Sequence, residues 1–147
     1  MNPLQTTTVL LIDANRDDRQ YWTERLKSSS KDYTVLEADT AETGLLVCKC
    51  EQIDCVVTEL HLPDMSGFHV LIRLNPIVHR SVHKPVIALS HFILPSIIEA
   101  AKKLGAQSYL IKSQTSGNDL DQAIQNAIAK VGLNHKAVDG ERSPSLS

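Results

Sequence analysis

Four polar residues stand directly after short apolar runs of the chain, or one residue beyond them. These residues are Asp13, Glu59, Ser90 and Lys112. If the runs are parallel strands, their carboxyl ends meet at one edge of a sheet, and the four side chains lie close together. Two carboxylates, a hydroxyl and an ammonium in one small pocket are suited to bind a phosphate together with a divalent cation. The spacing therefore predicts a polar site at the carboxyl edge of a sheet.

Five apolar runs rich in leucine and β-branched residues predict the strands, because such runs are typical of strands buried on both faces. They cover residues 9–12, 34–36, 55–57, 86–89 and 109–111. Between them, apolar residues recur at helical spacing, as Phe68, Leu71 and Leu74 do in the third such segment. Strands that alternate with helices predict an α/β fold, with a parallel sheet covered by helices on both faces.

Start and stop signals agree with five helices. The predicted first residues are Asp17 or Asp18, Thr40, Ser66, Pro95, and Asn118 or Asp119, and the predicted ends of the last two helices are Gly105 and Gly132. The domain is therefore expected to cover residues 8–133, after an N-terminal extension at 1–7. Residues 134–147 hold few apolar side chains among Gly, Pro and Ser, which predicts a flexible tail.

Composition narrows the class of protein. A chain of 147 residues with 42% hydrophobic and 22% charged residues is typical of one globular domain. A net charge of −2 gives no electrostatic footprint for nucleic acid or for an anionic membrane. The sequence shows neither a membrane-spanning run nor a signal peptide, so we expect a cytoplasmic protein.

Cysteine and histidine spacing gives no metal-site pattern. Cys48, Cys50 and Cys55 have no fourth thiol or nearby histidine at the spacing of a zinc site. We therefore expect reduced and mostly buried thiols. The six histidines are expected to be solvated surface residues.

Four blocks of sequence, in order, resemble the receiver domain of bacterial two-component response regulators. They are Val-Leu-Leu-Ile-Asp-Ala-Asn-Arg-Asp-Asp-Arg at 9–19, the segment 54–67 ending in Leu-Pro-Asp-Met-Ser-Gly, Pro-Val-Ile-Ala-Leu-Ser at 85–90, and Gly-Ala-Gln-Ser-Tyr-Leu-Ile-Lys at 105–112. The resemblance implies a flavodoxin-like (βα)5 fold with strand order 2-1-3-4-5. It also implies a pocket in which an Asp accepts a phosphoryl group beside Mg²⁺.

The chain departs from that family at the phosphorylation pocket. The phosphoacceptor position falls on Glu59, and the second of the two acids after the first strand falls on Ala14. The family's pocket hydroxyl and lysine match Ser90 and Lys112, which we assign to the pocket with Asp13. The resemblance also implies a conformational switch, to which we assign Ser90 and the aromatic residue Tyr109. The proline that usually follows the lysine is Ser113, which removes the basis for expecting a cis peptide there.

These departures predict a degenerate site. Glutamate extends its carboxylate by about 1.5 Å relative to aspartate, and a misplacement of about 1 Å can cost on the order of 100-fold in rate. Only Asp13 and Glu59 remain as metal ligands, so we expect any Mg²⁺ to bind weakly. Glu59 has a length and charge that imitate part of a phosphorylated aspartate.

We therefore expect a single-domain response regulator receiver, in the form of a pseudo-receiver that acts through protein contacts. Its partners would be a sensor histidine kinase, a phosphotransfer protein or a downstream target. Two alternatives stay open. One is a receiver that still accepts phosphate on Glu59, and the other is a small α/β enzyme that uses Glu59 as general base and Lys112 as electrostatic stabiliser.

The segment 91–98 is unusually apolar for a loop that enters a helix. The residues assigned to an interface are Phe92, Ile93, Ile97 and Ile98, on the face through which receivers dimerise or bind targets. The alternative is a loop that packs on the sheet. Asp64 is the candidate for a surrogate phosphoacceptor, although its loop position also suits a role in the turn.

Overall fold

The computed structural model describes residues 6–29, 31–76 and 84–142, of which 133–142 are described as backbone only. The strands are β1 (Thr7–Ile12), β2 (Tyr33–Ala38), β3 (Cys55–Thr58), β4 (Val86–Ser90) and β5 (Ser108–Ile111). The helices are α1 (Arg16–Lys27), α2 (Ala41–Cys50), α3 (Gly67–Leu74), α4 (Pro95–Lys103) and α5 (Gly117–Arg142), with a short 3-10 turn, η1 (Lys112–Gln114), after β5. Each predicted strand and helix is present.

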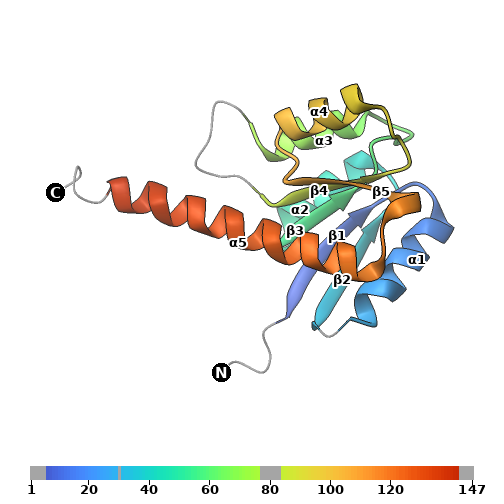
Figure 1. The fold of residues 1–147 in the computed structure, drawn as a ribbon, viewed down its shortest axis with the longest axis horizontal. Helices are drawn as coiled ribbons and strands as arrows, with labels where there is room; N and C mark the ends of the chain where they lie inside the picture. Colours follow the sequence, from blue (N-terminus) through green and yellow to red (C-terminus); the bar gives the residue numbers. More distant parts are fainter. Residues whose placement is uncertain (1–5, 30, 77–83, 143–147) are drawn as a thin grey trace.

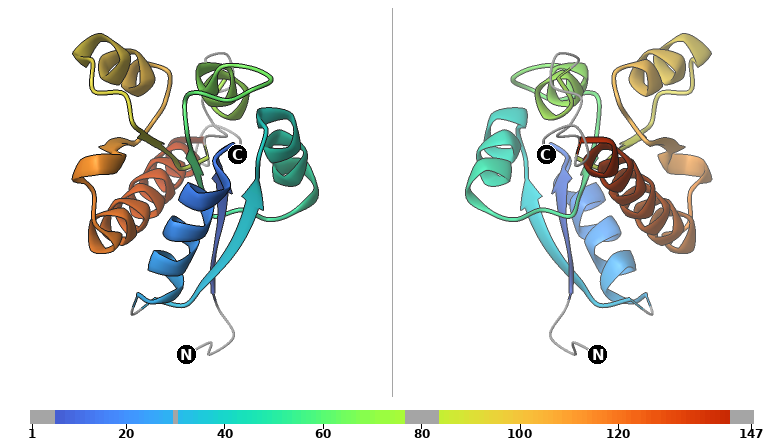
Figure 2. Two further views of the ribbon diagram at one scale, coloured as in Figure 1. Left: turned by 90° about the vertical axis from the view of Figure 1, so that its right-hand side faces the viewer. Right: turned by 90° about the vertical axis from the view of Figure 1, so that its left-hand side faces the viewer.

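The five strands form one parallel sheet in the order β2-β1-β3-β4-β5, so the predicted α/β flavodoxin-like topology is confirmed. Alternate residues of the central strands face opposite layers, as the period of two requires. In β1, Leu10 and Ile12 pack under α2 and α3, whereas Val9 and Leu11 pack under α1 and α5. Figures 1 and 2 show these two helical layers on either side of the sheet.

Helix starts follow the capping chemistry, with two corrections. Thr40 and Ser66 accept backbone N–H groups at the starts of α2 and α3, as predicted. The first helix is capped by Asn15, whose side chain accepts the N–H of Asp18, and not by Asp17 or Asp18. The fifth begins after Ser116, which exchanges hydrogen bonds with Asp119.

The predicted end of the fifth helix at Gly132 is wrong, because α5 continues to Arg142 and extends beyond the sheet (Figure 1). A β-carbon at Gly132 would meet nothing, so this glycine lies in a helix with open space around it. By contrast, Gly105 ends α4 with φ of 114°, the left-handed conformation that favours glycine. The tail boundary after residue 133 stays a prediction.

The thiols are less buried than expected. Cys55 is buried and Cys48 half-buried, but Cys50 is exposed at the end of α2. Among the helices that the structure describes, none has both the length and the apolar character needed to cross a bilayer.

Candidate functional site

The carboxyl edge of the sheet holds a charged cluster centred on the ammonium group of Lys112, which is itself largely buried. Its Nζ lies 2.7 Å from Asp13 Oδ2, 2.9 Å from Asp18 Oδ2 and 3.0 Å from Glu59 Oε1. An ammonium has three N–H donors, so each can serve one carboxylate. Asp13 follows β1, Glu59 follows β3 and Lys112 follows β5, so the crossover topology brings these side chains together.

Glu59 is fixed on both carboxylate oxygens, with only 3% of its surface exposed. Its Oε2 accepts the backbone N–H of Leu60 at 2.6 Å and that of His61 at 3.3 Å. Its Oε1 contacts His91 Nδ1 at 3.0 Å, in addition to Lys112. The carboxylate therefore connects the β3–α3 loop, the residue after β4 and the residue after β5.

The electrostatics of the cluster favour the charged forms. Burial raises the pKa of Glu59, but a hydrogen bond from Ser90 and the charge of Lys112 outweigh it, so the net pKa is lowered. Burial lowers the pKa of Lys112, but its hydrogen bonds to Asp13 and Asp18 and the charge of Glu59 give a net increase in that pKa. Both shifts favour the charged forms of Glu59 and Lys112 at neutral pH.

Ser90 and Tyr109 lie beside this cluster and organise the β4–α4 loop. Ser90 is fully buried, and its Oγ accepts the backbone N–H of Phe92 at 3.3 Å. The Tyr109 hydroxyl donates to the carbonyl of Phe92 at 2.9 Å. Burial is the main cause of the raised pKa of Tyr109. The residues assigned to the switch therefore both bond the same loop residue.

Two members of the cluster were not assigned to the site from the sequence. Asp18 is predicted from the sequence only as a possible helix start, but its carboxylate accepts a hydrogen bond from Lys112. His91 was expected to be a solvated surface histidine, but it pairs with Glu59, while 60% of its side chain stays exposed. Its position directly after Ser90 is the signal that points to it.

Asp64 serves the backbone. Its Oδ1 accepts the N–H of Ala41 and its Oδ2 that of Glu42, at 2.9 and 2.8 Å. These bonds, led by that from Glu42, lower the pKa of Asp64. Both oxygens are thus occupied at the start of α2, which favours the structural role over that of a surrogate phosphoacceptor.

The apolar segment after β4 divides into buried and exposed side chains. Phe92 and Ile97 are partly buried and pack against the core, and Ile98 is half-buried. Ile93 and its neighbour Leu94 are exposed by 62% and 57%. Of the four residues assigned to an interface, Ile93 is the one that presents most of its surface to solvent.

The sequence profile of the response regulator receiver domain matches residues 9–125. The chain belongs to this family. Among curated relatives, it is 26% identical over 127 residues to the sensory/regulatory protein RpfC of Xanthomonas campestris pv. campestris, covering 86% of this chain and 17% of that protein. It is 30% identical over 104 residues to the transcriptional regulatory protein GlrR of Escherichia coli K12, covering 70% of this chain and 22% of that protein.

Solved receivers share the fold. A response regulator receiver domain protein from Clostridium thermocellum is 30% identical with a TM-score of 0.74, over 86% of this chain and 98% of that one. The receiver domain of a putative LuxO repressor protein from Vibrio parahaemolyticus is 18% identical with a TM-score of 0.76, over 90% and 98% of the two chains.

The chain spans about a fifth of the length of the two curated relatives named above.

The acidic pocket of receivers commonly binds Mg²⁺, but the donor set of this chain fits the ion poorly. Asp13 and Glu59 both bond the Lys112 ammonium, and the side chain of Ala14 has no ligand atom. Asp13 Oδ1 also accepts the N–H of Asn15 at 2.9 Å. A cation would have to displace Lys112 from these carboxylates, and Mg²⁺ demands near-octahedral oxygen ligands.

The buried carboxylate predicts a specific acid sensitivity. The pKa of Glu59 is lower in the folded chain than its ordinary value of 4.5. Ionised Glu59 therefore stabilises the folded state. This contribution to the unfolding free energy is fully present above pH 4.5 and is lost as the pH falls through the lower pKa of the folded state. We expect the unfolding free energy of the wild type to fall more steeply between about pH 5 and pH 3 than that of Glu59→Gln.

Urea unfolding at a series of pH values measures this difference. The other acids with lowered pKa, Asp64 and Asp119, are present in both proteins, so their effects cancel in the comparison. Parallel pH profiles for the two proteins would contradict the assignment of Glu59 as an ionised, stabilising group.

Proposed function

We propose that this receiver is a pseudo-receiver in phosphorelay signalling, in which Glu59 stands permanently where a phosphorylated aspartate would act. The observation that carries the proposal is the placement of its carboxylate, 3.0 Å from both Lys112 Nζ and His91 Nδ1. A fixed negative charge thereby holds the pocket lysine and the first residue of the β4–α4 loop at once. In a phosphorylated receiver, the negative charge of an added phosphoryl group would have this effect.

The consequence of this charge is a fixed β4–α4 loop. Glu59 holds His91, and Ser90 and Tyr109 hold the backbone of Phe92. The next two residues, Ile93 and Leu94, are exposed apolar side chains at the start of α4. We propose that the Glu59 carboxylate fixes Ile93 and Leu94 in position to bind a downstream target protein. The other partners to be tested are a second copy of the chain, a sensor histidine kinase and a phosphotransfer protein.

Changing Ile93 to Asp is expected to weaken target binding or self-association by about tenfold or more without unfolding the domain, because the side chain is 62% exposed. Ile97→Asp is the matched comparison. Ile97 packs against the core, so a charge there should destabilise the fold. Binding of captured partners and circular dichroism measure the two effects, and unfolding by Ile93→Asp would contradict the assignment of that residue to an interface.

Two other functions are less well supported. Phosphorylation of Glu59 itself would need an ammonium free to meet the incoming phosphate, whereas the Lys112 ammonium already contacts three carboxylates. A general base needs a pKa near the working pH, whereas the pKa of Glu59 is lowered, chiefly by Ser90 and Lys112 against the effect of burial. The lowered pKa therefore disfavours Glu59 as the general base of a small enzyme.

The test is treatment of the wild type with labelled acetyl phosphate, or with a phosphorylated histidine kinase, with and without Mg²⁺. The pseudo-receiver is expected to remain unlabelled under all conditions. Labelling at Glu59 would establish the active receiver instead, and turnover of small esters or phosphates would establish the enzyme.

A further inference from the structure

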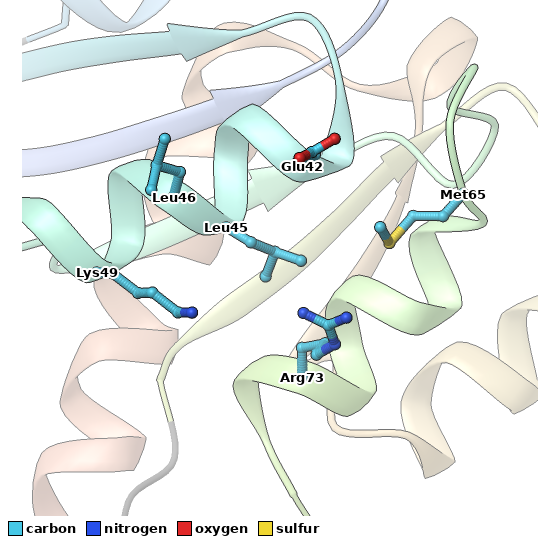
Figure 3. Close-up of a pocket in the computed structure, with 6 residues that line it drawn as sticks. All are labelled: Glu42, Leu45, Leu46, Lys49, Met65 and Arg73. Atoms are coloured by element: carbon cyan, nitrogen blue, oxygen red, sulfur yellow. The ribbon is translucent and has the colours of Figure 1, made fainter.

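A groove of about 320 Å³ lies between α2 and α3, and its lining on the α3 side runs from Met65, before the helix, to Arg73 in its last turn. Its lining residues are Glu42, Leu45, Leu46, Lys49, Met65 and Arg73. Figure 3 shows the two helices as its walls. On α2, the lining positions 42, 45, 46 and 49 share one face, and the seven steps from 42 to 49 cover about 10 Å of helix.

Two cations of the groove, Lys49 and Arg73, are not paired with its one lining carboxylate, Glu42. Lys49 from α2 and Arg73 from α3 both extend their charged ends into the space between the helices (Figure 3). Neither forms an ion pair with a carboxylate among the side chains that the structure describes. Two facing cations repel each other, and an acidic group placed between them would be bound by both.

The same groove offers an apolar contact surface. Leu45 forms its buried base, Met65 is half-buried, and Leu46 is exposed by 59% on the rim. Methionine adapts its shape to different partners, and the exposed Leu46 adds apolar contact area on the rim of the groove. The ligand therefore needs apolar side chains as well as acidic ones.

The groove continues past Lys49 and Arg73 into a second hollow of about 480 Å³. Half-buried Cys48, buried Leu74 and half-buried Lys84 line this continuation. The third cation makes this end positively charged, whereas Glu42 lines the opposite end. The charge complementarity thus favours a ligand whose acidic residues lie at the Lys84 end.

We propose that the α2–α3 groove binds an amphipathic helix of a partner protein, with acidic side chains between Lys49 and Arg73 and apolar side chains on Leu45 and Leu46. Two turns of such a helix match the length of the lining on α2. The proposal is independent of the pseudo-receiver, because no described residue lining the groove forms a hydrogen bond or an ion pair with Glu59 or Lys112.

The test uses a synthetic helical peptide of about 15 residues with leucines on one face and glutamates beside them. We expect it to shift the NMR signals of Leu45, Leu46 and Arg73. The charge-reversed variant Lys49→Glu with Arg73→Glu should bind it about tenfold or more weakly, and should prefer a peptide with lysines in place of the glutamates.

Both substituted side chains are exposed, so the fold should survive, and circular dichroism checks this. The double variant Lys49→Gln with Arg73→Gln removes both charges without reversing them. It is expected to weaken binding of the acidic peptide without creating a preference for the lysine peptide. Lys102→Glu with Lys103→Glu on α4, also exposed, is the matched control and should leave peptide affinity unchanged.

Three results would overturn the proposal. The first is no binding of the acidic peptide, or equal binding to the wild type and the reversed variant. The second is that decanoate, a small amphipathic anion, binds the groove but the acidic peptide does not. The third is a concentration-dependent shift of the same signals without peptide, which would assign the groove to a second copy of the chain.

Discussion

Lys112→Met is expected to lower the unfolding free energy by about 3–5 kcal/mol at pH 7, because it removes one partner from a buried ionic cluster. The side chains of Lys112, Asp13 and Glu59 are exposed by only 13%, 4% and 3%. Without the ammonium, these two carboxylates would repel each other in a site that water reaches poorly. Urea or thermal unfolding measures the loss.

Lys103→Met is the matched control. Lys103 pairs with Glu99 on the surface of α4, at 3.7 Å with both side chains largely exposed. Exposed pairs contribute little, so this variant should stay within about 0.5 kcal/mol of the wild type. Equal effects of the two substitutions would show that Lys112 does not neutralise a buried cluster.

Glu59→Asp combined with Ala14→Asp is expected to convert the chain into an active receiver. The shorter side chain retracts the carboxylate, and the second acid supplies the missing metal ligand. We expect labelling by acetyl phosphate with Mg²⁺ to rise about 100-fold or more over the wild type. The product should be an acid-stable, base-labile acyl phosphate at residue 59.

The single variants are the controls for this result. Both substitutions act on one metal-phosphoryl centre, so the pair should gain more than the product of the singles. Full activity of Glu59→Asp alone would show that Ala14 is not a missing ligand position. A double variant that binds Mg²⁺, seen as an NMR shift at Asp13, but remains unlabelled would show that the rest of the pocket has diverged.

The sheet could be predicted because its central strands are apolar on both faces and are followed by polar residues. The runs at 9–12 and 55–57 are so apolar that only a central position in a covered sheet would bury them. Parallel topology then places the residues that follow them at one edge, which is why Asp13, Glu59 and Lys112 could be grouped before their distances were known.

The contacts of Asp18 and His91 could not be predicted in this way. Asp18 reaches Lys112 from the first turn of α1, which depends on the helix starting at Asn15. His91 reaches Glu59 from a loop, where no periodicity fixes the direction of a side chain. Both contacts follow from local backbone geometry that the sequence pattern does not specify.

The same limit explains the error at the end of α5 and the division of the apolar loop. Glycine inside a helix costs only about 1 kcal/mol relative to alanine, so Gly132 does not have to end one. In the segment 91–98, apolar residues in succession do not reveal which face the core, and the structure buries part of Ile97 while it exposes Ile93. The composition of the segment alone could not show that Ile97 is partly buried and Ile93 exposed.

The most direct test of the pseudo-receiver is an NMR comparison of the wild type with Glu59→Gln, which keeps the shape of the side chain and removes its charge. Lys112 would still bond Asp13 and Asp18, so the fold should persist. If the Glu59 charge fixes the β4–α4 loop, the signals of His91, Phe92 and Tyr109 will shift, and the amides of Ile93 and Leu94 will exchange faster with solvent. Unchanged signals and exchange rates in this loop would contradict the account.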